Sequence, residues 1–161
     1  MTPITVGVGD LQVSSDVNSV LVTYGVGSCI AVLAFDPVLH VAGMVHYMLP
    51  LSAITPEKAK ARPAMFGDTG VPLLFERLLR LGSRKSDWIV KVVGGASIQD
   101  NNKTFEIGKR NYVMVRRLLG AAGVAISAES VGGAGWRTAR LFVGDGRTTV
   151  RASDHFAEVE L

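Results

Sequence analysis

Short apolar runs separated by glycines, prolines and polar turns dominate the opening part of this chain, a pattern typical of β-strands. The runs are rich in Val, Ile, Leu and Met, and they predict strands over residues 4–8, 11–13, 19–24, 30–36 and 41–48. Both faces of the last two predicted strands are largely apolar, so we expect their sheet to be covered on both sides.

Farther along the chain, apolar residues recur with helical spacing and predict amphipathic helices over residues 69–81 and 109–122. The remaining apolar runs predict strands over residues 88–93, 124–129, 141–143 and 148–151. Because strands outnumber helices and do not alternate regularly with them, we predict an α+β fold of layered β-sheets flanked by two main helices. The length of 161 residues favours one domain covering residues 1–161.

The turn between the fourth and fifth predicted strands indicates which residues face each other across that hairpin. Asp36 followed by Pro37 is the signature of a type I turn. A loop of two or four residues centred on Pro37 and Val38 pairs residue 29 with residue 46. Directly opposed residues have Cβ atoms about 4.5–5.5 Å apart. We therefore expect Cys29 and His46 to be direct neighbours.

Cys29 is the only cysteine, so it forms no internal disulfide and serves either packing or reactivity. A neighbouring imidazole lowers a thiol pKa from about 8.5 to between roughly 3.5 and 7.5, which makes Cys29 and His46 a candidate nucleophile and base. The alternative interpretation is a small buried cysteine beside an unrelated histidine, since free cysteine is among the most buried residue types. The residues alone leave both interpretations open.

A nucleophile and base usually need a third group that orients the imidazole. Thr23 lies on the preceding predicted strand, and its hydroxyl is a candidate acceptor for a ring N–H. Threonine is also simply a good strand former, so this interpretation too has an alternative. Ser28 is interpreted as a turn residue whose backbone shapes the loop before Cys29.

Composition and spacing narrow the classes of function. A net charge of +3 favours an acidic protein surface as partner over nucleic acid. The spacing of His40, His46 and His155 matches no metal motif and the glycine pairs complete no nucleotide-binding motif, so we expect neither metal nor cofactor. No apolar run reaches the roughly 20 residues of a membrane span. One cysteine and no evident export signal predict a cytoplasmic protein, expected to be a monomer.

Several motifs together resemble one known family. They are Val-Thr-Tyr-Gly-Val-Gly-Ser-Cys at 22–29, Asp-Pro at 36–37, Gly-Met-Val-His-Tyr-Met-Leu-Pro at 43–50, Phe-Gly-Asp at 66–68, Lys-Val-Val-Gly-Gly-Ala at 91–96, Ile-Gly-Lys-Arg-Asn at 107–111, and Gly-Gly at 132–133 followed by Arg137. On these segments the chain resembles, nearly end to end, the CheD family of chemoreceptor glutamine deamidases in bacterial and archaeal chemotaxis.

The resemblance implies a cysteine hydrolase fold shared with deamidating toxins of the cytotoxic necrotizing factor type. It implies a protein-glutamine glutaminase in which Cys29 is the nucleophile, His46 the general base and Thr23 the group that orients His46. Its substrates would be glutamines on the cytoplasmic helices of methyl-accepting chemoreceptors, converted to glutamate through a thioester and so made available for methylation. Family members also hydrolyse glutamyl methyl esters, and some bind the phosphatase CheC.

Two further expectations concern the surroundings of the nucleophile. Backbone N–H groups around Gly27 and Ser28 are candidates for stabilising an oxyanion, because the neighbouring glycines let amides turn inward. Residues 51–65, expected to be an exposed loop, carry Lys58, Lys60 and Arg62 as a candidate docking edge for the substrate helix. The competing class is a non-catalytic module on the same fold that binds receptors or CheC.

Overall fold

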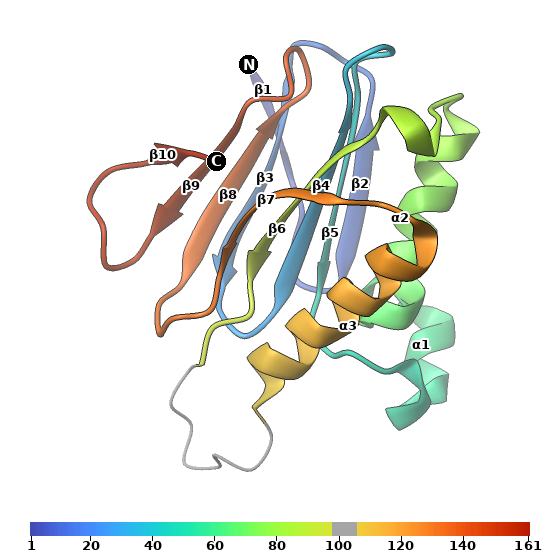
Figure 1. Ribbon diagram of the computed structural model, residues 1–161, viewed down its shortest axis with the longest axis vertical. Coiled ribbons are helices and arrows are strands. Elements are labelled where there is room, and N and C mark those ends of the chain that lie inside the picture. Colours follow the sequence, from blue (N-terminus) through green and yellow to red (C-terminus); the bar gives the residue numbers. More distant parts are fainter. Residues whose placement is uncertain (98–105) are drawn as a thin grey trace.

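The computed structural model describes residues 1–97 and 106–161. In these residues the strands form two five-stranded sheets, stacked face to face, with α2 and α3 covering the outer face of one (Figure 1). The strands are β1 (Thr2–Thr5), β2 (Asp10–Ser14), β3 (Ser19–Val26), β4 (Ile30–Asp36), β5 (Val41–Tyr47), β6 (Ile89–Gly94), β7 (Ile126–Val131), β8 (Arg137–Phe142), β9 (Thr148–Ala152) and β10 (Val159–Glu160). The helices are α1 (Pro56–Ala61), α2 (Gly67–Arg80) and α3 (Ile107–Ala122), with short 3₁₀ turns η1 (Ser52–Ile54), η2 (Pro63–Met65) and η3 (Lys85–Asp87).

The strand order is β1-β3-β8-β9-β10 in the first sheet and β2-β5-β4-β6-β7 in the second. Most neighbours are antiparallel, whereas β1 pairs with β3 and β6 pairs with β7 in parallel. The predicted α+β class, with layered sheets and two main helices, is confirmed.

The central strands β4 and β5 are buried along their whole length, as their two apolar faces predicted. Ala31 and Leu33 face the core between the two sheets. Ile30 and Val32 face the opposite core, which α2 and α3 cover. This alternation assigns every second residue of the second sheet to the inter-sheet core, where the candidate site lies.

The predicted direct pairing of Cys29 with His46 is wrong, because the hairpin turn lies farther along the chain. Ala31 pairs with His46, and the ladder closes with Asp36 opposite Val41. The Asp36 carboxylate accepts hydrogen bonds from two amides of the turn, and His40 ends the turn in a left-handed conformation with φ of +52°. The shift amounts to two positions, and Cys29, just before β4, packs against the same inter-sheet core that His46 faces.

The expectation of an exposed loop over residues 51–65 is also wrong, since the segment folds into η1, α1 and η2. Pro56 occupies the start of α1, where its missing N–H costs no hydrogen bond. The Ala and Lys residues that follow are good helix formers, and one short turn of helix results. No helix in the described part of the chain is long and apolar enough to span a membrane.

Candidate active site

His46 lies on β5 and points into the core between the two sheets, where its side chain is fully buried. Its backbone is held on the other side by β2: His46 pairs with Asp10, and its carbonyl accepts a 2.7 Å hydrogen bond from the amide of Gly9. The imidazole is therefore attached to a rigid central strand of the second sheet.

Thr23 reaches this imidazole from the opposite sheet. Its Oγ1 lies 2.8 Å from Nδ1 of His46 and donates a 2.7 Å hydrogen bond to the carbonyl of Val6. Because the single hydroxyl proton is committed to Val6, the ring must donate its Nδ1–H to Oγ1. The contact thus selects the tautomer of His46 that leaves a lone pair on Nε2.

The protonation state of His46 follows from its burial. Removal from water lowers the pKa of His46 from 6.5 to about 4, so the ring is neutral at pH 7. Nε2 is buried and has no hydrogen-bond partner among the described residues. Among the described residues, Nε2 of His46 is therefore a basic nitrogen without a hydrogen-bond partner, in an environment largely shielded from water.

Cys29 lies in the connection between β3 and β4, half-buried, where it packs against the inter-sheet core that also receives His46. Burial raises the pKa of the Cys29 thiol above its ordinary value of 9.0. This is the opposite of the lowering expected from a neighbouring imidazole. The physical reason is that the imidazole is itself neutral, so no nearby positive charge offsets the loss of hydration of a thiolate. The resting pair is a neutral thiol and a neutral ring.

The Cys29 loop is braced by the end of β6. The amide of Gly95 donates to the carbonyl of Cys29 at 2.8 Å, and the amide of Ala96 donates to the carbonyl of Gly27 at 2.9 Å. Gly94 has φ of +117°, and a Cβ added there would lie 2.2 Å from the Cys29 carbonyl oxygen. Only glycine permits this close approach, which explains the Gly-Gly pair in the sequence.

Asn111 on α3 braces the same loop from the other side. Its Nδ2 donates 2.9 Å hydrogen bonds to the backbone carbonyls of Ser28 and Met48. Its backbone carbonyl accepts a hydrogen bond from the hydroxyl of Tyr47. One buried amide thus joins the residue before Cys29 to the segment leaving β5. Sequence reasoning assigned Asn111 no role. The available signal was its place one helical turn before Val115 on the apolar stripe of α3, where a polar residue needs an explanation.

Backbone N–H groups at the loop remain available, as a candidate oxyanion site requires. In the described ranges, no backbone carbonyl accepts a hydrogen bond from the amides of Gly27, Ser28 or Cys29. Gly25, with φ of +63°, lies where the register of β3 against β8 shifts between Thr23 and Val26, just before the chain leaves β3.

The predicted docking residues divide into two groups. Lys58 and Lys60 are exposed on α1. Arg62 instead donates through Nη2 to the carbonyls of Val8 and Gly9, at 3.1 and 3.3 Å, and so supports the turn that leads into β2. Arg62 is therefore engaged within the chain beside the backbone of His46.

In the part of the chain that the structure describes, no group of three or more His, Cys, Asp or Glu side chains could hold a metal ion.

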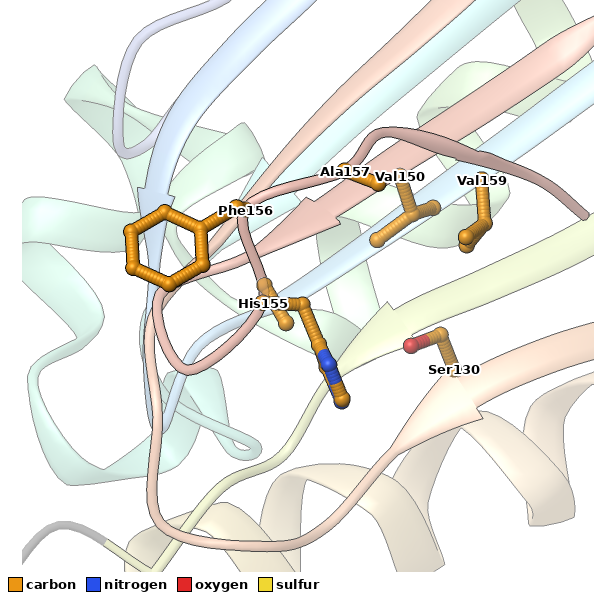
Figure 2. A pocket seen from close by; sticks show the side chains of 7 residues that line it. Ser130, Val150, His155, Phe156, Ala157 and Val159 are labelled. Atoms are coloured by element: carbon orange, nitrogen blue, oxygen red, sulfur yellow. The ribbon is translucent and has the colours of Figure 1, made fainter.

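A hollow of about 500 Å³ lies between β7, β9 and the segment before the C-terminus (Figure 2). Its lining is mainly apolar and contains none of the candidate residues: it comprises Ser130, Val150, Ala152, His155, Phe156, Ala157 and Val159.

Comparison with known proteins adds a family relationship to this geometry. The family model for CheD chemotactic sensory transduction matches residues 48–152. The chain is 50% identical over 157 residues to the probable chemoreceptor glutamine deamidase CheD 2 of Anaeromyxobacter dehalogenans, covering 98% of this chain and 99% of that protein. It is 45% identical to the probable chemoreceptor glutamine deamidase CheD 1 of Syntrophus aciditrophicus, covering 95% and 96% of the two chains.

More distant similarities are also found. A probable chemoreceptor glutamine deamidase CheD of Pyrococcus horikoshii is 35% identical, with 94% of this chain and 93% of that protein covered. Among solved structures, the hypothetical protein YfiH of Bacillus licheniformis is 17% identical with a TM-score of 0.49, covering 75% of this chain and 50% of that chain.

Proposed function

The chain belongs to the CheD family, and on that premise we propose that it deamidates selected glutamine side chains of chemoreceptors, with Cys29 as nucleophile. The observation that carries this proposal is the Thr23–His46 contact, which leaves a basic Nε2 directed into the core that Cys29 also enters. A neutral histidine and a cysteine at the same core are the base and nucleophile that amide hydrolysis through a thioester requires.

In the first half of the reaction, Nε2 of His46 takes the proton of the Cys29 thiol as sulfur attacks the amide carbon of glutamine. Because thiol and imidazole are both neutral at rest, proton transfer accompanies the attack instead of preceding it. His46 then returns that proton to the amide nitrogen. The C–N bond breaks, ammonia leaves, and a thioester joins the substrate to Cys29.

In the second half, His46 removes a proton from water as the water oxygen attacks the thioester carbon. The C–S bond breaks, the thiol of Cys29 recovers the proton, and glutamate is released. Two easier steps replace the direct hydrolysis of an amide, which is a poor electrophile. A glutamyl methyl ester follows the same path with methanol as leaving group, so methylesterase activity is a consistent side reaction.

Each tetrahedral intermediate carries a negative oxygen that needs hydrogen-bond donors. The amides of Gly27, Ser28 and Cys29 donate to no backbone carbonyl among the described residues, which supports them as the oxyanion site. The hydrogen bonds that Gly95 and Ala96 make to this loop preorganise those amides.

A second candidate function is binding without catalysis, with a receptor or the phosphatase CheC as partner. The exposed Lys58 and Lys60 of α1 are compatible with an acidic partner in either case. The presence of Cys29 together with a tautomer-selected His46 favours the catalytic proposal.

The test is intact-mass analysis of a purified chemoreceptor cytoplasmic fragment incubated with the wild type, Cys29→Ala or Cys29→Ser. The wild type should add about one mass unit per modified site, since NH₂ is replaced by OH, and neither variant should do so. Stable co-purification with the fragment, without any mass change, would instead support the binding module. Turnover by Cys29→Ala would exclude the proposed nucleophile.

A further inference from the structure

A groove of about 420 Å³ runs between the segment after β5 and the first turns of α3. It is lined by Pro50, Leu51, Ile54, Glu106, Lys109, Arg110, Val113, Met114 and Arg117. Two lining residues, Leu51 and Ile54, belong to the segment 51–65 that was predicted as a docking edge, whereas the predicted docking residues Lys58, Lys60 and Arg62 are not in the lining.

The groove lies beside the candidate site. Its first lining residue, Pro50, follows Met48 by two positions, and the carbonyl of Met48 shares the side-chain amide of Asn111 with the carbonyl of Ser28. Asn111 and the groove residue Arg110 are adjacent on α3. The groove and the Cys29 loop are therefore built on the same two segments, α3 and the chain that leaves β5.

Three apolar side chains of the groove lining are open to solvent. Leu51 is 44% exposed, Ile54 is 63% exposed and Val113 is 49% exposed. Single exposed apolar side chains are common, but several lining one groove mark an interaction surface.

The rim of the groove is basic. Lys109, Arg110 and Arg117 line it against one carboxylate, Glu106, which lies 3.9 Å from Lys109. No ion pair engages Arg110 or Arg117 within the described residues. Arg110 and Arg117 are seven residues apart, so they lie on the same side of α3 about 10 Å from each other along its axis.

We propose that this groove binds an acidic amphipathic α-helix of the substrate protein and so sets which glutamines reach Cys29. The proposal rests on the function proposed above. Apolar side chains of the bound helix pack on Leu51, Ile54 and Val113, while carboxylates two turns apart pair with Arg110 and Arg117. Exposed apolar side chains with charges at helical spacing suit a helix laid into a groove, and arginine forks suit carboxylates.

The experiment measures deamidation kinetics of a chemoreceptor cytoplasmic fragment by mass spectrometry, comparing wild type with the double variant Arg110→Glu/Arg117→Glu. We expect KM to rise about tenfold or more with kcat within about twofold of wild type, because the variant loses docking and keeps the chemistry. Ile54→Ser, at an exposed position, should raise KM several-fold. The salt dependence of KM should weaken in the double variant.

The matched control is Arg77→Glu/Arg151→Glu, which makes the same change in net charge at exposed positions outside the groove. Equal KM values for the control and the groove variant would overturn the groove and leave only general electrostatic attraction. A fall in kcat with unchanged KM would also overturn it. Absence of wild-type deamidation would instead count against the proposed function, so the two failures are distinguishable.

A separate observation concerns Asn111, whose side chain is fully buried and whose Oδ1 has no hydrogen-bond partner among the described residues. The hydrogen bonds that its side chain makes to the described residues both go to backbone carbonyls, those of Ser28 and Met48. Leaving a buried acceptor unpaired destabilises the fold, so the two donated hydrogen bonds need a purpose beyond packing α3.

We infer that Asn111 is a positioning residue that orients the peptide between Ser28 and Cys29 for catalysis. Its donor pulls the Ser28 carbonyl toward α3, which turns the Cys29 amide of the same peptide to the opposite side. In this way a helix remote in sequence sets the direction of a proposed oxyanion donor.

The test compares Asn111→Asp, which replaces the donor by an acceptor of the same shape, with Asn111→Ala. Both should lower kcat at least tenfold with KM within about twofold, and Asn111→Asp should be the worse because its carboxylate repels two carbonyls. Ser83→Ala is the matched control, since it removes buried hydrogen bonds to Asp36 and Trp88 at the far end of β4. It should lower Tm while leaving kcat near wild type.

Tyr47→Phe provides a milder disturbance of the same anchor, because it removes only the hydroxyl that binds the Asn111 carbonyl. It should reduce kcat by a few-fold even if both Asn111 variants fail to fold. Wild-type kcat in folded Asn111 variants, or in Tyr47→Phe when those variants do not fold, would reduce Asn111 to a structural residue.

Discussion

The Oγ1 atom of Thr23, on one sheet, lies 2.8 Å from Nδ1 of His46, on the other. Since Thr23 donates its own proton to Val6, this contact selects the tautomer in which Nε2 is basic. The proposed base therefore exists in its reactive form only when the two sheets are packed together. Chemistry at this site is coupled to the integrity of the inter-sheet core.

Replacing Thr23 tests this coupling. Thr23→Val keeps the shape and removes the hydroxyl, so Nδ1–H of His46 and the Val6 carbonyl both lose their partner. We expect kcat to fall about 10- to 100-fold, since general-base efficiency depends on the orientation of the imidazole. Thr23→Ser, which keeps the hydroxyl, should remain near wild type. Steady-state deamidation assays measure both.

Thr148→Val is the control for this substitution, because Thr148 is also a buried strand threonine. It should change kcat by less than about twofold. Equal losses at positions 23 and 148 would show that Thr23 is only a strand residue.

The pH dependence of the reaction should reflect a neutral resting pair. With the pKa of His46 lowered to about 4 and that of Cys29 raised by burial, we expect kcat/KM to rise with pH through about 4 and then stay level through neutral pH. The expected sign follows because protonation of His46 removes the base. A rate profile across this range, with an acid limb near pH 6.5 as the contrary outcome, checks the prediction.

The same buried histidine should make the fold sensitive to acid. The pKa of His46 is lower in the folded state than in the unfolded chain, so its contribution is fully present above pH 6.5 and is lost as the pH falls to about 4. The loss amounts to about 3 kcal/mol of the free energy of unfolding. Urea unfolding at a series of pH values, for wild type and His46→Gln, isolates this part as the difference between the two curves. Parallel curves would contradict it.

Substituting two glycines by alanine tests whether the Cys29 loop requires glycine at position 94, with Gly120 as the control. Gly94→Ala places a Cβ 2.2 Å from the Cys29 carbonyl oxygen at a φ of +117°, so we expect a loss of about 2–4 kcal/mol in unfolding free energy and a large fall in activity. Gly120→Ala lies in α3 with nothing near its Cβ position and should raise stability by about 0.5–1 kcal/mol. Thermal unfolding and activity assays distinguish them; a tolerated Gly94→Ala would show that the loop adapts.

Local patterns predicted the elements well where the pattern was long and regular. The stripes over residues 69–81 and 109–122 became α2 and α3, with bounds only a few residues different. The two-residue strand β10 carries too little pattern to be predicted. The prediction for the segment 51–65 was wrong because its two prolines, Pro56 and Pro63, suggested breaks in regular structure. Pro56 instead occupies the first position of α1, where proline starts a helix.

The hairpin register shows where sequence reasoning reached its limit. Asp36–Pro37 correctly indicated a turn, but its length depended on His40, whose left-handed conformation is accompanied by a 2.8 Å contact of its Nδ1 with the distant carbonyl of Gly144. The predicted register differs from the observed one by two residues. Because side chains alternate with a period of two, this difference leaves Cys29 and His46 on the same face.

By itself, the sequence determined the α+β class, the two main helices and the identity of Thr23, Cys29 and His46 as the candidate residues, because periodicity and motifs are local properties. Only the tertiary structure decided that Thr23 contacts His46 across the sheet interface, that burial keeps thiol and imidazole neutral, and that Asn111 reaches the Cys29 loop from α3. These depend on contacts and desolvation between segments far apart in the chain, which no local pattern encodes.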